Sequence, residues 1–241
     1  MKQQALLPFF YSRWTTTLRW QYFVVTLLFA DAKSQTFEGN LLAFEHELSL
    51  WSRTGVQLMF DSLHFSLSLD AQLRLGGKKL AFQTLQGRTH LNYHFSPQTL
   101  LSVGAISFTP QFGTTTNILL LQAMHFFASQ NLQPALRARL DYRWQIHHDT
   151  TLPTIGNWRL RLQPILFIAL ASTLKLVLNN EFFFEEQTPQ LIDENRFQAG
   201  LQWKIDSNTL LLVAYQNRAF LANKVKFEHT LFVVLLTSLH I

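Results

Sequence analysis

Arginine and acidic side chains recur at alternate positions through much of this 241-residue chain. Residues 135–144, ALRARLDYRW, place a charged residue at every second position after Leu136. A guanidinium group binds a carboxylate or a phosphate through two parallel hydrogen bonds. Such a cluster could therefore hold the protein's own acids or bind a small anion. The candidate charge network consists of Asp70, Arg74, Arg88, Arg137, Arg139, Asp141, Arg143, Arg159, Arg161, Glu181, Arg196 and Arg218.

Four of these arginines lie on two consecutive runs of the chain, residues 133–144 and 157–167. They are Arg137, Arg139, Arg159 and Arg161, and they would repel one another unless acids or ions intervene. Asp141 and Glu181 are the nearest acids by the order of these runs. We expect Glu181 to be ionised and paired with at least one of the arginines. Two interpretations of the network stay open. It is a structural network of paired buried charges, or it is a basic filter for a small anion.

Histidine and serine also occur together, in the two His-Phe-Ser pieces that begin at His64 and His94. A serine hydrolase needs a histidine beside its nucleophile and a third group that orients the histidine. Ser66 and His64 could supply the first two parts, but the chain offers no matching third motif. We therefore predict no catalytic residue, and an enzyme is the less favoured class.

Metal and cofactor sites find little support. The pair of histidines in residues 147–149, HHD, would point to opposite sides of a strand, and no distant third ligand accompanies it. The acidic residues 185–194, EEQTPQLIDE, could hold Ca²⁺ shared with lipopolysaccharide phosphates, or be simply solvated. The chain has no cysteine, which excludes disulfides and thiolate sites. We predict neither a metal nor a cofactor.

The elements that must position the charged residues show a period of two, which is the period of a β-strand. Polar and apolar residues alternate in the runs 63–75, 87–95, 133–144, 157–167, 173–185 and 194–204. Short breaks near Ser96, Ser129 and Asp206 contrast with longer ones that begin at Thr109, Gln145, Glu186 and Ala219. Alternating short and long connections are typical of an up-and-down barrel with tight periplasmic turns and longer external loops.

The composition of the two faces separates a membrane barrel from a soluble one. The polar face carries Arg, Gln, His, Asn and acids, whereas the other is Leu and aromatic. Trp144, Trp158, Trp203 and Tyr215 lie near the ends of runs, as interfacial aromatics do. We therefore predict an all-β fold, a single closed antiparallel transmembrane barrel. The alternative is a soluble sandwich or a soluble periplasmic lipid-binding barrel.

The number of strands follows from topology. Eleven candidate strands lie between Glu47 and Leu239. Barrels of this type have an even number of strands with both termini in the periplasm. Residues 35–44, QTFEGNLLAF, could provide another strand, so we predict twelve. The alternative is ten strands with the N-terminal segment inside the barrel.

The first residues have the pattern of a secretory signal peptide. Three basic residues precede the apolar stretch 22–30, and Ala30 and Ala32 fit the small residues of a cleavage site. The expected division is a signal peptide at 1–32 and an outer-membrane barrel at 33–241. The best rival for a spanning helix, residues 160–178, contains Arg161, Pro164 and Lys175 and is too interrupted. Cleavage would leave a net charge of only +3, so we predict no nucleic-acid partner.

The middle and the end of the chain resemble the family named domain of unknown function 2490. The similar pieces, in order, include RTHLNYHFSPQTLLSVG, LRARLDYRW, WRLRLQP, LNNEFFF, ENRFQAGLQWK and LLLVAYQNR, and the resemblance covers about residues 51–239. It implies a secreted Gram-negative barrel and no known catalytic residues.

These observations together predict an outer-membrane β-barrel with an Arg-rich lumen. Its function would be that of a narrow pore or of a structural component of the envelope. The alternatives are an outer-membrane lipid-modifying enzyme and a soluble periplasmic lipid binder. The expected partners are outer-membrane lipid and lipopolysaccharide, the barrel-insertion machinery, and a small anion.

Overall fold

A computed structural model describes residues 47–60, 63–77, 80–111, 114–128, 132–146, 156–186, 192–220 and 226–241. These residues form eleven strands in chain order. They are β1 (Glu47–Phe60), β2 (Phe65–Gly76), β3 (Ala81–Ser96), β4 (Thr99–Pro110), β5 (Thr115–Phe126), β6 (Leu132–Ile146), β7 (Gly156–Ala171), β8 (Leu174–Glu185), β9 (Glu194–Lys204), β10 (Thr209–Phe220) and β11 (Lys226–His240). The strand periods read from the sequence are confirmed.

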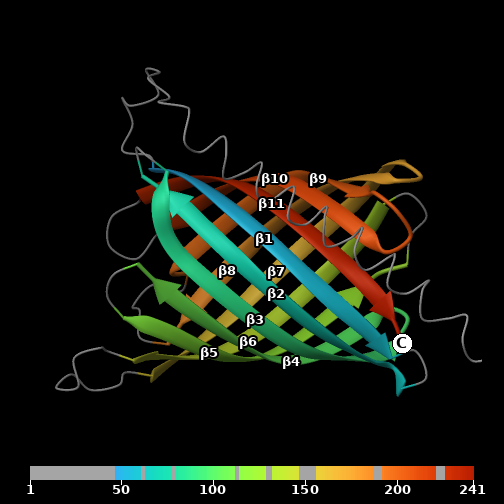
Figure 1. Cartoon of the computed structure of the whole chain (residues 1–241), viewed down its shortest axis with the longest axis horizontal. Helices are drawn as coiled ribbons and strands as arrows, with labels where there is room; N and C mark the ends of the chain where they lie inside the picture. Colours follow the sequence, from blue (N-terminus) through green and yellow to red (C-terminus); the bar gives the residue numbers. More distant parts are fainter. Residues whose placement is uncertain are drawn as a thin grey trace, which may run out of the picture. The chain divides into compact units, whose positions relative to one another are not determined.

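The eleven strands close into one barrel in which every strand pairs with its neighbours in the chain (Figure 1). These pairings are antiparallel, but β1 and β11 meet in parallel, from Glu47 opposite Glu228 to Met59 opposite His240. The prediction of a single closed antiparallel barrel is confirmed except at this one parallel seam, whereas the predicted count of twelve strands, with ten as the alternative, was wrong. An odd number of alternating strands brings the first and last into the same direction, so they close in parallel. Residues 35–44, the expected twelfth strand, lie outside the described residues.

Side chains alternate between the two faces of the sheet, as the period of two requires. On β2, Ser66, Asp70 and Gln72 are buried inside the barrel, whereas Phe65 and Leu69 are exposed outside. Paired residues of neighbouring strands share a face, so polar positions form continuous inner rows. One sector of the inner wall is apolar instead. There Ile106 of β4 packs with Ile118 and Leu120 of β5 and with Phe108.

The connections at the two ends of the barrel differ in length. At one end, β3 and β4 are joined by residues 97–98, and β7 and β8 by residues 172–173. At the other end, β6 and β7 are joined by residues 147–155, and β8 and β9 by residues 186–193. The expected alternation is clear here, but the connections at 77–80 and 111–114 are as short as some at the opposite end.

β1 starts at the end with the longer connections, and β11 finishes at the other end, beside the tip of β1 (Figure 1). No helix in the described part of the chain is long and apolar enough to cross a membrane. The expected signal peptide and its cleavage site lie before the first described residue.

Candidate functional site

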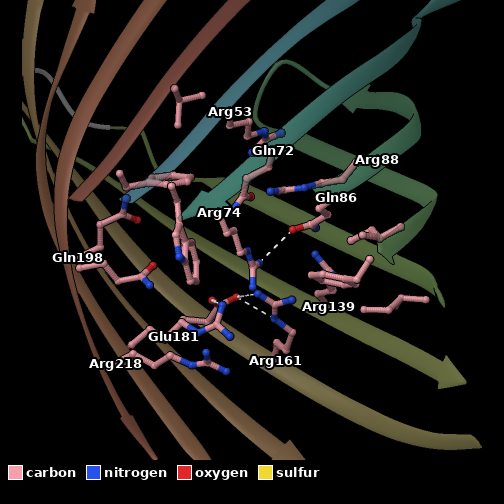
Figure 2. Close-up of a pocket in the computed structure, with 18 of the residues that line it drawn as sticks. Arg53, Gln72, Arg74, Gln86, Arg88, Arg139, Arg161, Glu181, Gln198 and Arg218 are labelled. Carbon is pink, nitrogen blue, oxygen red and sulfur yellow. Dashed lines mark hydrogen bonds and ion pairs between the residues drawn. The ribbon is translucent and has the colours of Figure 1, made fainter. Parts of the chain in front are cut away.

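A cavity of about 510 Å³ lies inside the barrel, and its wall is strongly cationic. Ten arginines line it, but only two acids do, Asp141 and Glu181. Figure 2 shows some of these arginines, among them Arg74 and Arg161, around the cavity with Glu181. The other acids that pair with these arginines do not line the cavity. The part of the network that lines the cavity is therefore strongly positive. The lining arginines are Arg53, Arg74, Arg88, Arg137, Arg139, Arg143, Arg159, Arg161, Arg196 and Arg218.

Glu181 of β8 holds the centre of the network. Its Oε1 accepts hydrogen bonds from Arg161 Nη2 at 2.6 Å and from Arg137 Nη2 at 3.0 Å. Arg196 Nη1 approaches the other carboxylate oxygen at 4.0 Å. The expected pairing of Glu181 with an arginine is thus present. The three arginines come from β6, β7 and β9, so one buried carboxylate ties together four consecutive strands.

Asp141 is the second acid on the cavity wall. It pairs with Arg139, two residues earlier on the same face of β6, whose Nη2 donates to Asp141 Oδ2 at 3.1 Å. Arg161 on β7 reaches the same oxygen at 3.4 Å. Arg161 therefore bridges Asp141 and Glu181, and these two pairs form one connected network.

A second group of acids lies toward the end of the barrel with the longer connections. Glu194 of β9 pairs with Arg196 on its own strand and with Arg218 of β10. Arg218 also pairs with Glu228 of β11, through Nη1 at 3.1 Å. Glu194, at 1% exposure, is buried more deeply than most lumen residues. This group connects the last three strands as Glu181 connects the middle ones.

Arg143 and Arg159 extend the network toward the connection between β8 and β9. Arg143 donates to Glu185 at 2.9 Å, and Arg159 donates to Asp193 at 2.8 Å. Asp193 precedes β9, and its burial raises the pKa of its carboxyl group, while the charge of Arg159 acts in the opposite direction. This edge of the network lies at the end of the barrel where β8 finishes and β9 begins.

The wall formed by β1–β3 is arranged differently. Asp70 receives two hydrogen bonds from Arg53, at 2.8 and 3.0 Å, and lies 3.3 Å from Arg88. Arg74, on the same face of β2, donates instead to the amide oxygen of Gln86 at 3.0 Å. It is the only arginine of the cavity wall without a carboxylate within 4.0 Å among the described residues.

Two aromatic rings separate the guanidinium groups. Phe183 is fully buried at 0% exposure, and three arginines of β7 and β9 lie 4.4–5.0 Å from its ring centre. Trp51 of β1 has Arg74 at 4.0 Å and Arg196 at 5.9 Å from its ring centre. Since cations are attracted to aromatic faces, the rings hold like charges close together. Arg74 and Arg196 lie on β2 and β9, so the lumen is narrow at this level.

Several buried polar atoms of the cavity wall have no hydrogen-bond partner among the described residues. All but one of those on the wall are N–H donors, and the exception is Gln163 Oε1. The donors without a partner are Trp51 Nε1, Gln72 Nε2, Arg74 Nε, Arg159 Nε, Gln198 Nε2 and Gln216 Nε2. Arg88 Nε makes no hydrogen bond but lies 3.3 Å from Asp70 Oδ1. The wall therefore has an excess of donors as well as of positive charge.

The structure places all twelve residues of the candidate network inside the barrel, and eleven of them line the cavity. Asp70 lies behind Arg53 and Arg88. Sequence reasoning missed other members of the network. They are Arg53, Trp51, Phe183, Glu185, Asp193, Glu194 and Glu228. For Phe183 the signal was available, because it shares the parity of Glu181 and Glu185 on β8.

The histidine and serine pieces form a separate cluster. Ser66 is fully buried and contacts Gln57, Asn92 and His94, with its Oγ 3.3 Å from His94 Nε2. His64 is instead the last residue before β2, with a φ of 56°, and its backbone oxygen accepts from the His94 amide. The predicted neighbours in sequence are thus not the pair that meets in space.

A metal site finds no further support. Among the described residues, no group of three His, Cys, Asp or Glu side chains could hold a metal ion. Residues 147–149 and 187–191 lie outside the described residues. Three of the four acids of the acidic stretch 185–194, Glu185, Asp193 and Glu194, pair with arginines.

Comparison with known proteins gives a family and a group of similar folds. Among curated proteins, none matches the chain. One similar solved structure is described as the NanC porin structure in a rhombohedral crystal form. It is 11% identical in sequence with a TM-score of 0.42, and the match covers 68% of this chain and 85% of the porin chain. Another is the KdgM porin in complex with disordered oligogalacturonate. It is 13% identical with a TM-score of 0.44, and the match covers 70% of this chain and 91% of that porin chain.

The family match is the more specific finding. It spans residues 48–226, which run from the start of β1 to the start of β11 and include the whole charge network except Glu228. The family is described as a protein of unknown function, DUF2490. The chain belongs to the DUF2490 family.

Proposed function

We propose that this protein is an outer-membrane β-barrel that acts as a narrow, anion-selective pore. The observation that carries the proposal is the cavity wall, where ten arginines face only two acids. Rings of arginine select anions because the fixed positive charge attracts them and repels cations. The unpartnered N–H donors add sites for anionic oxygens.

The outer face of the barrel supports a membrane location. Large apolar side chains are exposed on nearly every strand, whereas soluble monomers rarely expose apolar patches beyond a few hundred Å². Examples are Leu69, Leu91, Val103, Leu119, Leu140, Leu160, Leu201, Val213 and Leu231. A soluble periplasmic lipid-binding barrel would need a polar outer face, so this alternative is the weakest.

The dimensions of the strands agree with a bilayer. A strand of twelve residues, such as β4, is about 40 Å long. Tilted by about 45°, it crosses about 28 Å, close to the roughly 30 Å of a hydrocarbon core. Exposed aromatics lie toward both ends of the strands, with Phe65, Tyr93 and Trp203 at one end and Phe82 and Trp158 at the other. This is the distribution of interfacial aromatic belts.

The expected sidedness follows from the connections and from the N-terminal signal pattern. We place the end with the two-residue connections in the periplasm and the end with the longer ones outside. The segment 1–32 would direct secretion, and lipopolysaccharide would surround the outer end. The barrel-insertion machinery would be a partner during assembly.

A second candidate is a closed barrel with a structural role in the envelope. The observation that favours it is that nine of the ten arginines are paired with acids, mostly across strands. Such a network stiffens a small barrel. A lipid-modifying enzyme has no comparable support, because Ser66 is fully buried.

Planar-bilayer recording separates the two candidates. The folded protein, recognised by heat-dependent mobility on gels, should conduct with a small unitary conductance. In a KCl gradient its reversal potential should have the sign of a chloride preference. Inserted barrels that stay silent would favour the structural role, and a cation preference would contradict the pore as proposed.

A further inference from the structure

We infer that the wall around Arg74 is a binding subsite for an organic oxyanion with an apolar body. The inference rests on the proposed anion-accepting lumen and specifies what that lumen receives. The ligand would carry a carboxylate, phosphate or sulfate group, which share the acceptor geometry that arginine recognises. Three observations support it.

The first observation is the state of Arg74 itself. Its guanidinium group stacks on Trp51 at 4.0 Å and lies 5.1 Å from the ring centre of Phe108, and one Nη donates to Gln86. Its Nε is buried and has no partner, and no carboxylate of the described residues approaches within 4.0 Å. A buried guanidinium without a carboxylate in direct contact is costly. A bound oxyanion would remove this cost.

The second observation is that two neighbouring donors are also free. Trp51 lies directly opposite Arg74 in the pairing of β1 with β2, and Gln72 precedes Arg74 by two residues on the same face. Gln72 is 1% exposed, and its Nε2 has no partner, as is true of Trp51 Nε1. Both side chains line the cavity. The subsite thus combines one cation with two neutral N–H donors on a rigid wall.

The third observation is the apolar sector that begins at Phe108. Ile106 and Ile118 line the same cavity and form the buried apolar cluster of β4 and β5. Among the described residues, no other part of the cavity brings a guanidinium without a carboxylate partner next to such a surface. A cavity of about 510 Å³ is in the range that holds small organic ligands. The head group would bind at Arg74, and the apolar body would cover Phe108 and Ile106.

The two walls of the cavity therefore have different roles. On β6–β10 every arginine is already paired with a carboxylate. Those arginines attract anions by their charge, but their carboxylate partners already occupy the position where an anion would bind directly. On β2 the partner position is vacant. Figure 2 shows Arg74 reaching into the cavity toward Gln86, with Arg161 and Glu181 nearby.

The test uses benzoate binding to the folded full-length protein, measured by titration calorimetry in detergent. Benzamide serves as the uncharged analogue of the same shape, and acetate as the head group without the body. Benzoate should bind, and benzamide and acetate should bind at least about tenfold more weakly. Arg74→Gln should weaken benzoate binding by about ten- to a hundredfold, as expected for losing hydrogen bonds to a charged group.

Arg143→Gln is the matched control. It removes the same charge from the same cavity wall, but from an arginine that is paired with Glu185. It should change benzoate affinity less than about threefold. Arg74→Lys, which keeps the charge, should retain part of the affinity and provides a folded variant if Arg74→Gln fails to fold. Equal losses at Arg74 and Arg143, or equal binding of benzoate and benzamide, would overturn the inference.

The outcomes also separate this inference from the proposed pore. Benzoate binding that depends on Arg74, in a barrel that does not conduct, would refute the pore and leave the subsite. Anion-selective conductance without Arg74-dependent benzoate binding would leave the pore and refute the subsite.

Discussion

Arg161 donates two hydrogen bonds to a single oxygen of Glu181, from Nε at 2.9 Å and from Nη2 at 2.6 Å. Arg137 donates to the same oxygen from the neighbouring strand β6. The carboxylate is buried. Each of these arginines thus depends on a charge that lies on another strand.

Replacing Glu181 with Gln should therefore lower the stability of the barrel. Removing one member of a buried ion pair costs about 3–5 kcal/mol, because the remaining charge stays buried without a partner. Unfolding in urea, followed by gel mobility, measures the loss. The same variant should raise chloride selectivity. Glu186→Gln, at an exposed turn position, is the control and should leave both unchanged. A Glu181→Gln protein as stable as the wild type would contradict the network.

An arginine on the outer face tests the membrane assignment. Leu140 is 38% exposed, on the face of β6 opposite the charged residues. Leu140→Arg should destabilise the barrel in lipid by about 2–4 kcal/mol, the cost of a charge near the bilayer midplane. Phe95→Arg, beside the turn at 97–98, should cost less than about 1 kcal/mol. Equal stability of Leu140→Arg and wild type in bilayers would refute the assignment.

The ring of Phe183 should contribute more to the stability of the barrel than the ring of Phe182 beside it on β8. Phe183→Ala would leave a cavity among three arginines and remove the ring faces that hold them together. Truncations of buried Phe cost about 3–5 kcal/mol. Phe182→Ala, which removes the same group from the outer face, should cost clearly less. The free energy of unfolding of the two variants, compared in the same lipid, decides the matter.

A close strand contact gives a second pair of matched variants. A Cβ at Gly200 would lie 2.4 Å from the Cβ and 2.7 Å from the Cα of Ala214, its partner on β10. Gly200→Ala should therefore destabilise the barrel by about 1–3 kcal/mol, as overpacking does. Gly87→Ala meets nothing within 4 Å and should be neutral or slightly stabilising. Equal unfolding midpoints would mean that β9 and β10 can separate at this point.

Replacing Ser66 with Ala tests whether this residue has a structural or a catalytic role. Its hydroxyl contacts Gln57, Asn92 and His94, so Ser66→Ala would leave buried polar groups without a partner at a cost of about 1–3 kcal/mol. We expect this loss of stability and no esterase activity in either protein. Hydrolysis of a lipid ester by the wild type that disappears in a folded Ser66→Ala protein would instead support an enzyme.

The faces of the strands could be predicted because side-chain direction depends only on parity along a strand. Arg139, Asp141 and Leu140 are therefore where the alternation indicates. The count of strands could not be derived in the same way, because parity says nothing about which strands pair. The parallel contact of Ser49 with Thr230 depends on the total number of strands and has no local sequence pattern.

The residues of the candidate site could be predicted to a similar extent. The arginines and Glu181 stand out because charged residues within an apolar strand must face inward. Glu194 and Asp193 belong to a segment that resembles a solvated acidic loop, and only the start of β9 brings them to Arg218 and Arg159. The vacant position beside Arg74 depends on distances between strands, which no spacing in the sequence reveals.

The seam between β1 and β11 joins residues that are 181 positions apart, as in the contact of Ser49 with Thr230. All other strand pairs are sequence neighbours and can form as local hairpins. The barrel can therefore close only after β11 has joined the sheet. Until then the sheet has two open edges, one at β1 and one at the strand added last, and either edge could pair with strands of other chains. The ordering entropy of this single long-range contact should make closure the slow step of folding.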